Sequence, residues 1–333
     1  MMIETPYLLY LGSSRDPLAV KTARGIMIWR PDSVVGEVVS AESEMTVGAD
    51  RMTIEEGAKR GAKTLIIGYA NSGGYIEESN LEDIVKALEL GLNVASGLHH
   101  DLQENALIKE AAERQNCKLH NVRRSDKAFK VGTGTKRPGN RLLTVGTDCS
   151  VGKMFTSLAI QKEMEARGEN ADFRATGQTG IFIAGEGVPV DAVISDFISG
   201  SVESLSPARE DGGWDIIEGQ GSLFHPAYAG VSLGLLHGAQ PDHLILCHEA
   251  NRAHMRHLPG RSVPELEDCI KANLWAAKVV NPEAHFSGIA LNSRNLDKAE
   301  ADRLCAQLER EFKLPCQDPM RHGVERIVDH VLI

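Results

Sequence analysis

Short apolar runs alternate with amphipathic segments along the first third of the chain. The apolar runs, each the length of a buried strand, are residues 7–11, 25–29, 64–67, 93–95 and 118–122. The amphipathic segments, which predict helices, are residues 54–60, 81–90 and 103–114. Strands that alternate with helices form a parallel sheet with crossover helices, so this region predicts an α/β domain.

The same alternation returns after a polar stretch. Strands are predicted at residues 142–145, 171–175, 241–247 and 286–291, with one more in 214–226 that ends at Glu218. Helices are predicted from residue 153 onward and at 263–277, 298–312 and 323–332. The intervening stretch is basic and rich in Gly, which is typical of a linker. Because 333 residues exceed the usual size of one core, we predict two α/β domains, residues 1–123 and 141–333, joined by a linker at 124–140.

The stretch LLTVGTDCSVGKMFTS combines a short apolar strand, a Gly-bounded loop and a helix that begins at a Lys. This arrangement is typical of a phosphate-binding loop, in which successive N–H groups and the positive helix end converge on an anion. The predicted anion-binding residues are Gly146, Thr147, Asp148, Cys149, Ser150, Val151, Gly152, Lys153 and Met154. The alternative is a plain strand-to-helix turn with a solvent-facing Lys.

Two details of this loop depart from the common pattern. Five residues separate Gly146 from Gly152, where the common pattern has four. Met154 stands where Ser or Thr normally offers a hydroxyl to Mg²⁺, and a thioether is a poor ligand for a hard cation. The loop therefore predicts phosphate binding without identifying the phosphate compound.

Three polar loops of the first domain follow predicted strands, at residues 11–17, 68–76 and 95–102. Ligands of parallel sheets bind beyond the carboxyl ends of the strands, so His99 and His100 are candidate general bases or metal ligands. The alternative is that one His caps the next helix while the other is solvated. The Gly73–Gly74 pair permits close approach of a ligand, or forms an ordinary turn.

In the second domain, Glu218 ends a strand and predicts, with Asp148, an anchor for Mg²⁺ if the protein uses that ion. The segment 248–261 is rich in His and Arg. Its Arg252 and Arg256 predict a cationic wall for a carboxylate or phosphate, with a solvated loop as the alternative. Zinc is disfavoured because His248 and His254 are six residues apart and share no helical face.

Composition narrows the class of protein. A formal net charge of −10 argues against a nucleic-acid partner. Six cysteines without CxxC spacing suit a reducing compartment, no run approaches the length of a membrane span, and no signal peptide is evident. We therefore predict a cytoplasmic protein that acts on a small molecule.

The loop GTDCSVGK resembles the GTDxxVGK loop of dethiobiotin synthetase, and EGQGSL resembles that enzyme's EGAGG segment. The whole chain resembles one small family. The resemblance is carried by seven segments, which occur along the chain in the order LGSS, GYANSGGYI, ASGLHHDL, GTDCSVGK, TGQTG, EGQGSL and GIALNSR. In that family a Rossmann-like N-terminal domain is joined to a C-terminal P-loop NTPase-like domain of the dethiobiotin synthetase type. One branch is the D-glutamate N-acetyltransferase family, which transfers acetyl from acetyl-CoA to a D-amino acid.

The resemblance implies further roles. Asn292 of GIALNSR would contact a nucleotide base, and Thr179 of TGQTG would lie close to the phosphates and the substrate. A homo-oligomer is implied because dethiobiotin synthetases build their site across a dimer. Acetyl transfer would use a base from a set of four candidates, His99, His100, Glu218 and His225, with Arg252 and Arg256 on the substrate carboxylates.

Our leading hypothesis is an N-acetyltransferase that acts on D-glutamate or a similar D-amino acid, with the phosphate loop as the anchor for acetyl-CoA. The second is a ligase or kinase that uses ATP and Mg²⁺ on a carboxylate, in which Lys153, Asp148 and Glu218 handle the phosphates. The third is a nucleotide-binding protein without catalytic turnover.

Overall fold

The computed structural model describes residues 3–16, 19–40, 43–69, 74–124 and 127–333. Gly73 of the predicted Gly pair lies outside these residues. The chain divides into two compact units, which we describe separately: unit 1 comprises Met1–Asp126 and Gly177–Pro189, and unit 2 comprises Lys127–Thr176 and Val190–Ile333. Within the described ranges, no helix is both long enough and apolar enough to cross a membrane.

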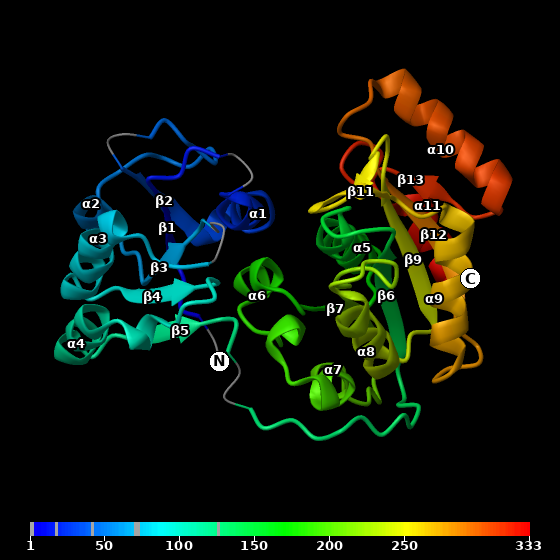
Figure 1. The fold of residues 1–333 in the computed structure, drawn as a ribbon, viewed down its shortest axis with the longest axis horizontal. Coiled ribbons are helices and arrows are strands. Elements are labelled where there is room, and N and C mark those ends of the chain that lie inside the picture. Colours follow the sequence, from blue (N-terminus) through cyan, green and yellow to red (C-terminus); the bar gives the residue numbers. More distant parts are fainter. Residues whose placement is uncertain (1–2, 17–18, 41–42, 70–73, 125–126) are drawn as a thin grey trace. The chain divides into compact units, whose positions relative to one another are not determined.

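Unit 1 is built on a five-stranded parallel sheet with the order β2-β1-β3-β4-β5. The strands are β1 (Tyr7–Gly12), β2 (Val34–Val39), β3 (Thr64–Ile67), β4 (Asn93–Ser96) and β5 (Leu119–Asn121). The helices are α1 (Lys21–Trp29), α2 (Ile54–Lys59), α3 (Glu78–Glu89), α4 (Ala106–Gln115) and α6 (Gln178–Ala184), with 3₁₀ turns at Pro31–Ser33 and Leu102–Glu104. Helices α2, α3 and α4 cover one face of the sheet, and α1 and α6 cover the other (Figure 1). This is a doubly wound α/β sheet.

One predicted strand of unit 1 is wrong. Residues 25–29 belong to helix α1, and the second strand of the sheet is instead β2. The apolar run looked like a buried strand, but Ile26 is buried while Ile28 is 44% exposed. Thr22 and Ala23 are buried together with Ile26, which is the spacing of one helix face.

Helix α6 belongs to unit 1 although it follows a strand of unit 2 in the chain. The Tyr7 hydroxyl donates to the carbonyl of Phe182 at 3.4 Å, and Arg30 Nε donates to the carbonyl of Ile183 at 3.3 Å. The sequence-based domain bounds put this helix inside residues 141–333. Contacts in the structure place it against β1 and α1.

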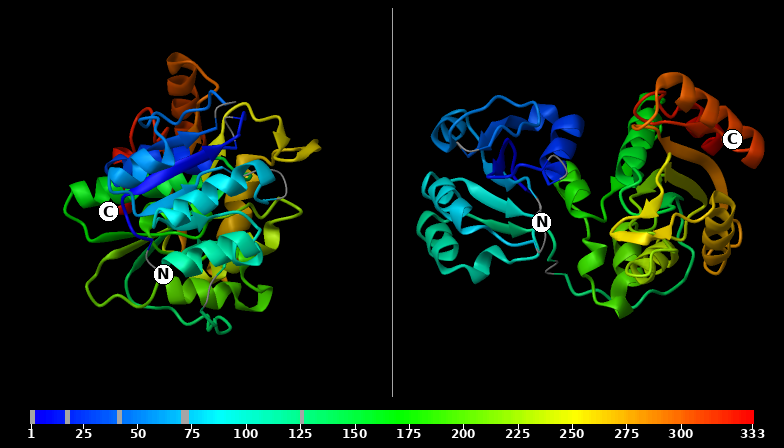
Figure 2. Two further views of the ribbon diagram at one scale, coloured as in Figure 1. Left: turned by 90° about the vertical axis from the view of Figure 1, so that its left-hand side faces the viewer. Right: turned by 45° about the horizontal axis from the view of Figure 1, so that its top comes forward.

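Unit 2 is built on a six-stranded parallel sheet with the order β13-β12-β9-β6-β8-β7. The strands are β6 (Asn140–Gly146), β7 (Ala171–Arg174), β8 (Trp214–Ile217), β9 (His243–Glu249), β12 (His285–Asn292) and β13 (Cys316–Gln317), and β10 (His254–Met255) pairs antiparallel with β11 (Leu258–Ser262). The helices are α5 (Lys153–Ala166), α7 (Ile198–Leu205), α8 (Ala229–Ala239), α9 (Leu266–Lys278), α10 (Lys298–Phe312) and α11 (Glu325–Val331), with 3₁₀ turns at Val190–Ala192 and Ser195–Phe197. Helix α10 lies at the β13 edge of this sheet (Figure 2).

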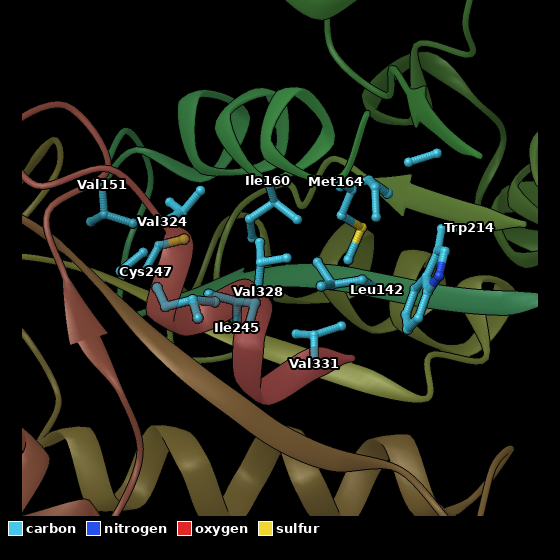
Figure 3. Packing of buried hydrophobic residues seen from close by; sticks show 14 residues of the cluster. Leu142, Val151, Ile160, Met164, Trp214, Ile245, Cys247, Val324, Val328 and Val331 are labelled. Atoms are coloured by element: carbon cyan, nitrogen blue, oxygen red, sulfur yellow. The ribbon is translucent and has the colours of Figure 1, made fainter. Parts of the chain in front are cut away.

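One hydrophobic core cluster of unit 2 lies between its sheet and the helices α5 and α11 (Figure 3). Ile160 and Met164 of α5 meet Leu142 of β6 and Ile245 of β9, and Val328 of α11 closes the cluster. Burial of each such side chain contributes about 1.5–3 kcal/mol. The packing fixes α5 against β6, and therefore fixes the loop that joins them.

Residues 127–139 of the predicted linker belong to unit 2 and contain no helix or strand. Arg137 anchors them by donating to the carbonyls of Ser206 and Gly238, at 2.9 Å each, and to the side chain of Gln240. The basic residues of this stretch therefore include one that is used for packing.

Candidate phosphate-binding site

The loop between β6 and α5 lies where the strand order of unit 2 reverses. Strand β6 pairs with β8 on one side and with β9 on the other, and such switch points are where open α/β sheets bind ligands. The loop turns sharply because two of its residues have positive φ, Ser150 at 55° and Gly152 at 112°. Gly152 is then the residue from which α5 starts. Residues 147–152 are called the phosphate loop below.

The phosphate loop presents backbone N–H groups that the protein itself does not use. Those of residues 150–154, from Ser150 to Met154, have no hydrogen-bond partner anywhere in the described ranges. Two of them belong to the first turn of α5, where the helix dipole adds positive potential. Consecutive free donors at a helix start are the arrangement that binds anions such as phosphate in proteins, and the predicted role of this loop rests on it.

Lys153 lies under the loop with only 7% of its surface exposed. Its Nζ donates to the carbonyl of Asp148 at 2.8 Å, and burial lowers its pKa. Gly146 leaves room for this position, because a Cβ there would lie 2.9 Å from Nζ. A phosphate in the loop would be the natural partner for this ammonium group.

A buried network of ion pairs and hydrogen bonds also holds the phosphate loop in place. Asp148 is fully buried, and its Oδ2 accepts from Arg252 Nη1 at 2.8 Å and from the backbone N–H of Arg256 at 2.7 Å. Its Oδ1 accepts from the N–H of Cys149 at 2.7 Å. Arg252 also pairs with Glu249 at the end of β9. Asp148, Arg252 and Glu249 are called the Arg252 cluster below.

Arg252 also binds the backbone of the phosphate loop. Its guanidinium donates to the carbonyl of Cys149 at 2.7 Å and to that of Ser150 at 3.2 Å. Its predicted role on a substrate carboxylate stays a prediction, and it would require one of these bonds to be given up.

Glu218 lies at the end of β8 and is also buried. Its Oε2 accepts from the N–H of Thr176 at 3.0 Å, and its carbonyl accepts from the hydroxyl of Thr176 at 2.6 Å. The next residue, Gly219, donates to Thr144 Oγ1 at 3.0 Å. A Cβ at Gly219 would lie 1.7 Å from the carbonyl oxygen of Thr144, so only Gly fits there. This contact seats the β8 loop directly on the strand that carries the phosphate loop.

Both ring nitrogens of His225 are engaged. Its Nδ1 lies 3.2 Å from the N–H of Ala227 and its Nε2 lies 3.0 Å from the carbonyl of Arg256. An N–H can only donate and a carbonyl can only accept, which fixes the neutral Nε2–H tautomer. His225 is therefore held as a structural contact in this arrangement, and a role as base would require it to release a bond.

His248 is a neighbour of the loop that was not among our candidate bases. Its Nδ1 lies 3.1 Å from Thr147 Oγ1, and burial together with the charge of Arg252 lowers its pKa to about 4. The ring is therefore neutral at neutral pH. The available signal in the sequence was its position one residue after the apolar run 241–247.

The remaining predicted residues divide between the two units. Asn292 ends β12 beside the loop, since a Cβ at Gly152 would lie 3.9 Å from Asn292 Cβ. His99 and His100 are exposed and belong to unit 1, and so does Thr179, whose hydroxyl lies 3.1 Å from that of Thr22. The structure therefore brings the predicted cofactor residues of unit 2 together. The roles of all these residues stay predictions.

The donors near the loop do not fit a magnesium ion. The carboxylate of Asp148 is used by Arg252 and by two backbone N–H groups, and Met154 offers a thioether. Asp148, Cys149 and His225 also bring potential ligand atoms within 4.8 Å of one another. Asp148 and His225 are already hydrogen-bonded in that group, so it does not form an open metal site either.

Models of a two-part protein family match this chain. Residues 32–125 match the Rossmann-like domain, and residues 130–328 match the P-loop domain, of the domain of unknown function DUF1611. The chain belongs to the DUF1611 family. The resemblance and the two-domain α/β fold predicted from the sequence are thereby confirmed.

Two curated relatives are similar to this chain over nearly their whole length. A D-glutamate N-acetyltransferase of Pseudoalteromonas sp is 48% identical over 98% of this chain and 99% of its own. A D-glutamate N-acetyltransferase of Tritonibacter scottomollicae is 50% identical over 98% of each chain. The crystal structure of a DUF1611 family protein from Anabaena variabilis, 29% identical, covers 98% of this chain and 99% of its own with a TM-score of 0.88.

Proposed function

We propose that this protein is a D-glutamate N-acetyltransferase that transfers the acetyl group of acetyl-CoA to the amino group of D-glutamate. Support for the reaction comes from the two relatives of that name, which are about half identical over their full length. The structural observation that carries the proposal is the row of free backbone N–H groups at residues 150–154, together with the buried ammonium group of Lys153. Acetyl-CoA carries a pyrophosphate and a 3′-phosphate that such a site can bind.

In acetyl-CoA, the phosphates that would be bound by the loop lie far from the acetyl group that reacts. Its thioester lies at the far end of the pantetheine arm, so groups that contact the phosphates do not also contact the acetyl group. Lys153 and the loop N–H groups are therefore proposed as binding groups. Asn292, beside the loop, is proposed to contact the adenine.

The general base is proposed to come from outside the phosphate loop. Transfer to an amine needs a base that removes the ammonium proton, and donors that stabilise the oxyanion of the tetrahedral intermediate. His225 and Glu218 are both held by backbone hydrogen bonds. Of the four candidates, His99 and His100 are exposed, and we propose that the base is one of them.

The reaction is tested with the purified protein, acetyl-CoA and either D- or L-glutamate, by following free CoA with a thiol reagent. We expect release of CoA that depends on D-glutamate and a product heavier by one acetyl group. His99→Asn or His100→Asn is expected to lower kcat without changing affinity for CoA. Turnover of ATP with Mg²⁺ and a carboxylate, without release of CoA, would replace this proposal by the ligase or kinase alternative.

We also propose a cytoplasmic homo-oligomer. Trp275 is 76% exposed on α9, and Val279 immediately after this helix is 62% exposed. Exposed apolar residues that lie close together are typical of subunit contacts. Light scattering on the purified protein tests this, and Trp275→Glu is expected to lower the measured mass if α9 forms the contact.

A further inference from the structure

We infer that this phosphate loop is built to bind phosphates without a metal ion, and that Arg252 positions the loop by holding its backbone carbonyls. The inference rests on the proposed function only for the identity of the occupant, acetyl-CoA. The arrangement of the loop itself is argued from the contacts of residues 148–154 and of the Arg252 cluster.

The first step concerns the ligands that a magnesium ion would need. A hard cation takes oxygen ligands, and three positions of the loop region were candidates to supply them. Met154 supplies sulfur, Asp148 is saturated by Arg252 and two N–H groups, and Glu218 binds the N–H of Thr176. The positive charge near the phosphates comes instead from Lys153 and from the first turn of helix α5.

The second step concerns the burial of the Arg252 cluster. A buried carboxylate is costly unless it is paired and hydrogen-bonded, and Asp148 has three donors around it. Glu249 is 2% exposed and pairs with both Arg252 and Arg294. Asn295 Nδ2 also donates to Glu249 at 3.3 Å. The guanidinium of Arg252 is thus held in one orientation from two sides.

The third step links this orientation to the free donors. In a trans peptide the C=O and the following N–H point in opposite directions. Arg252 binds the carbonyls of Cys149 and Ser150. The same two peptide groups carry the N–H groups of Ser150 and Val151, which must then point away from Arg252. Arg252 therefore orients two of the five donors without touching the ligand.

The test uses calorimetric titration with two probes, CoA and inorganic pyrophosphate, each in EDTA and in excess Mg²⁺. For the wild-type protein we expect affinities that agree within about twofold between the two media. Arg252→Gln is expected to bind both probes about tenfold more weakly, the effect of about one charge-assisted hydrogen bond, while KM for D-glutamate is unchanged. Arg252→Lys keeps the charge but loses the two-pronged geometry, so it should rescue only part of the affinity.

The matched control is Arg261→Gln, which removes an exposed arginine of β11 and should bind like the wild type. Binding to the wild type only in Mg²⁺, or no binding of either probe, would overturn the inference. Unchanged affinity in Arg252→Gln would remove the positioning role, and a raised KM for D-glutamate alone would make Arg252 a carboxylate ligand. Metal-independent binding of pyrophosphate without binding of CoA would support the inference while overturning the proposed function. The wild-type comparison decides the metal question even if a variant does not fold.

Discussion

Two arginines with little exposure lie at opposite ends of the parallel strands of unit 2 and bind carbonyl oxygens with different consequences. We call the side of the sheet where the strands begin the amino edge, and the side where they end the carboxyl edge. At the amino edge, Arg141 is fully buried, and its guanidinium donates to the carbonyls of Arg137, Pro138 and Pro207 at 2.8–2.9 Å. At the carboxyl edge, Arg252 donates to two carbonyls of the phosphate loop. The carbonyls bound by Arg141 close a turn around the cation. The bonds of Arg252 instead orient two peptide groups so that their N–H groups are left free.

The difference shows what makes a buried cation structural or functional. Arg141 is surrounded by oxygen atoms, including Asp215 at 3.9 Å, so this site leaves no group directed at a ligand. Arg252 is held by Asp148 and Glu249 in a similar way, but the peptides that it binds expose donors on their other side. The role depends on the geometry of the neighbouring peptides and not on the burial of the charge.

The largest expected effect is at the amino edge. Arg141→Met leaves the buried carbonyls of Arg137, Pro138 and Pro207 without their donor, which should lower the free energy of unfolding by about 3–5 kcal/mol. Urea titration measures this, and Arg303→Met, an exposed position on α10, should change it by less than about 0.5 kcal/mol. The fraction that stays folded should bind CoA like the wild type. Loss of CoA affinity in folded Arg141→Met would break the distinction between the two edges.

The next effect is at the contact between the β8 loop and β6. Gly219→Ala forces the backbone apart because its Cβ would meet the carbonyl of Thr144, at a cost of about 1–3 kcal/mol. Lys153 Cδ lies 3.0 Å from the same Cβ position, so affinity for CoA should fall with stability. Gly230→Ala, whose Cβ meets open space near the start of α8, is the control and should leave both quantities unchanged. Normal CoA binding by Gly219→Ala would show that the loop does not depend on this contact.

Lys153→Ala tests the carboxyl edge alone. The loss of one charge-assisted contact of about 1.5–3 kcal/mol should weaken CoA binding by roughly ten- to a hundredfold. The protein should stay folded, because the one hydrogen bond that the Lys153 side chain makes among the described residues is to the carbonyl of Asp148 in the phosphate loop. Calorimetry and thermal unfolding measure the two quantities, with Lys162→Ala on the exposed side of α5 as the control. Affinity equal to the wild type would contradict the phosphate-loop assignment.

The smallest effect is the pH dependence of the amino edge. Burial and the neighbouring His285 lower the pKa of His243 to about 4 from the ordinary value of 6.5. Below pH 6.5 the unfolded chain gains a proton that folded His243 refuses, so stability should fall as the pH drops from about 6.5 to about 4. We expect about 1–2 kcal/mol over this window, allowing for solvent screening at a partly exposed ring.

His243→Asn should make this part of the pH profile less steep, as measured by urea titration at several pH values. His254→Asn, at an exposed position of β10, should leave the profile unchanged. An identical slope in His243→Asn and the wild type would assign the acid sensitivity to other groups. His248 sits at the other end of the same strand with a pKa also lowered to about 4, there because of burial and Arg252.

The sequence predicted the features that depend on neighbouring residues. The phosphate loop, the helix that begins at Lys153 and most strands of unit 2 follow from local pattern and spacing. The error at residues 25–29 arose because four consecutive apolar residues fit a strand and one helix face equally well. The burial of Thr22 and Ala23 together with Ile26 identifies one face of a helix. That burial results from packing against α6 and β1, and the local sequence pattern does not contain this information.

The Arg252 cluster was beyond the reach of sequence patterns for a different reason. Asp148 and Arg252 are 104 residues apart, and either one alone suggested a ligand contact. Their mutual bond consumes the groups that each appeared to offer. Similarly, His225 looked like a free base until the structure showed both of its nitrogens bonded.

The placement of Gly177–Pro189 in unit 1 has a consequence for dividing this protein. Neither unit is one continuous stretch of sequence, so a cut at residue 126 does not separate two intact folding units. The fragment 1–126 would lack α6 and expose the surface that Tyr7 and Thr22 now share with it. The fragment 127–333 would carry that helix without its own sheet. Gene fusions, split versions or exchanges between relatives would therefore succeed only if they move residues 177–189 together with the N-terminal part.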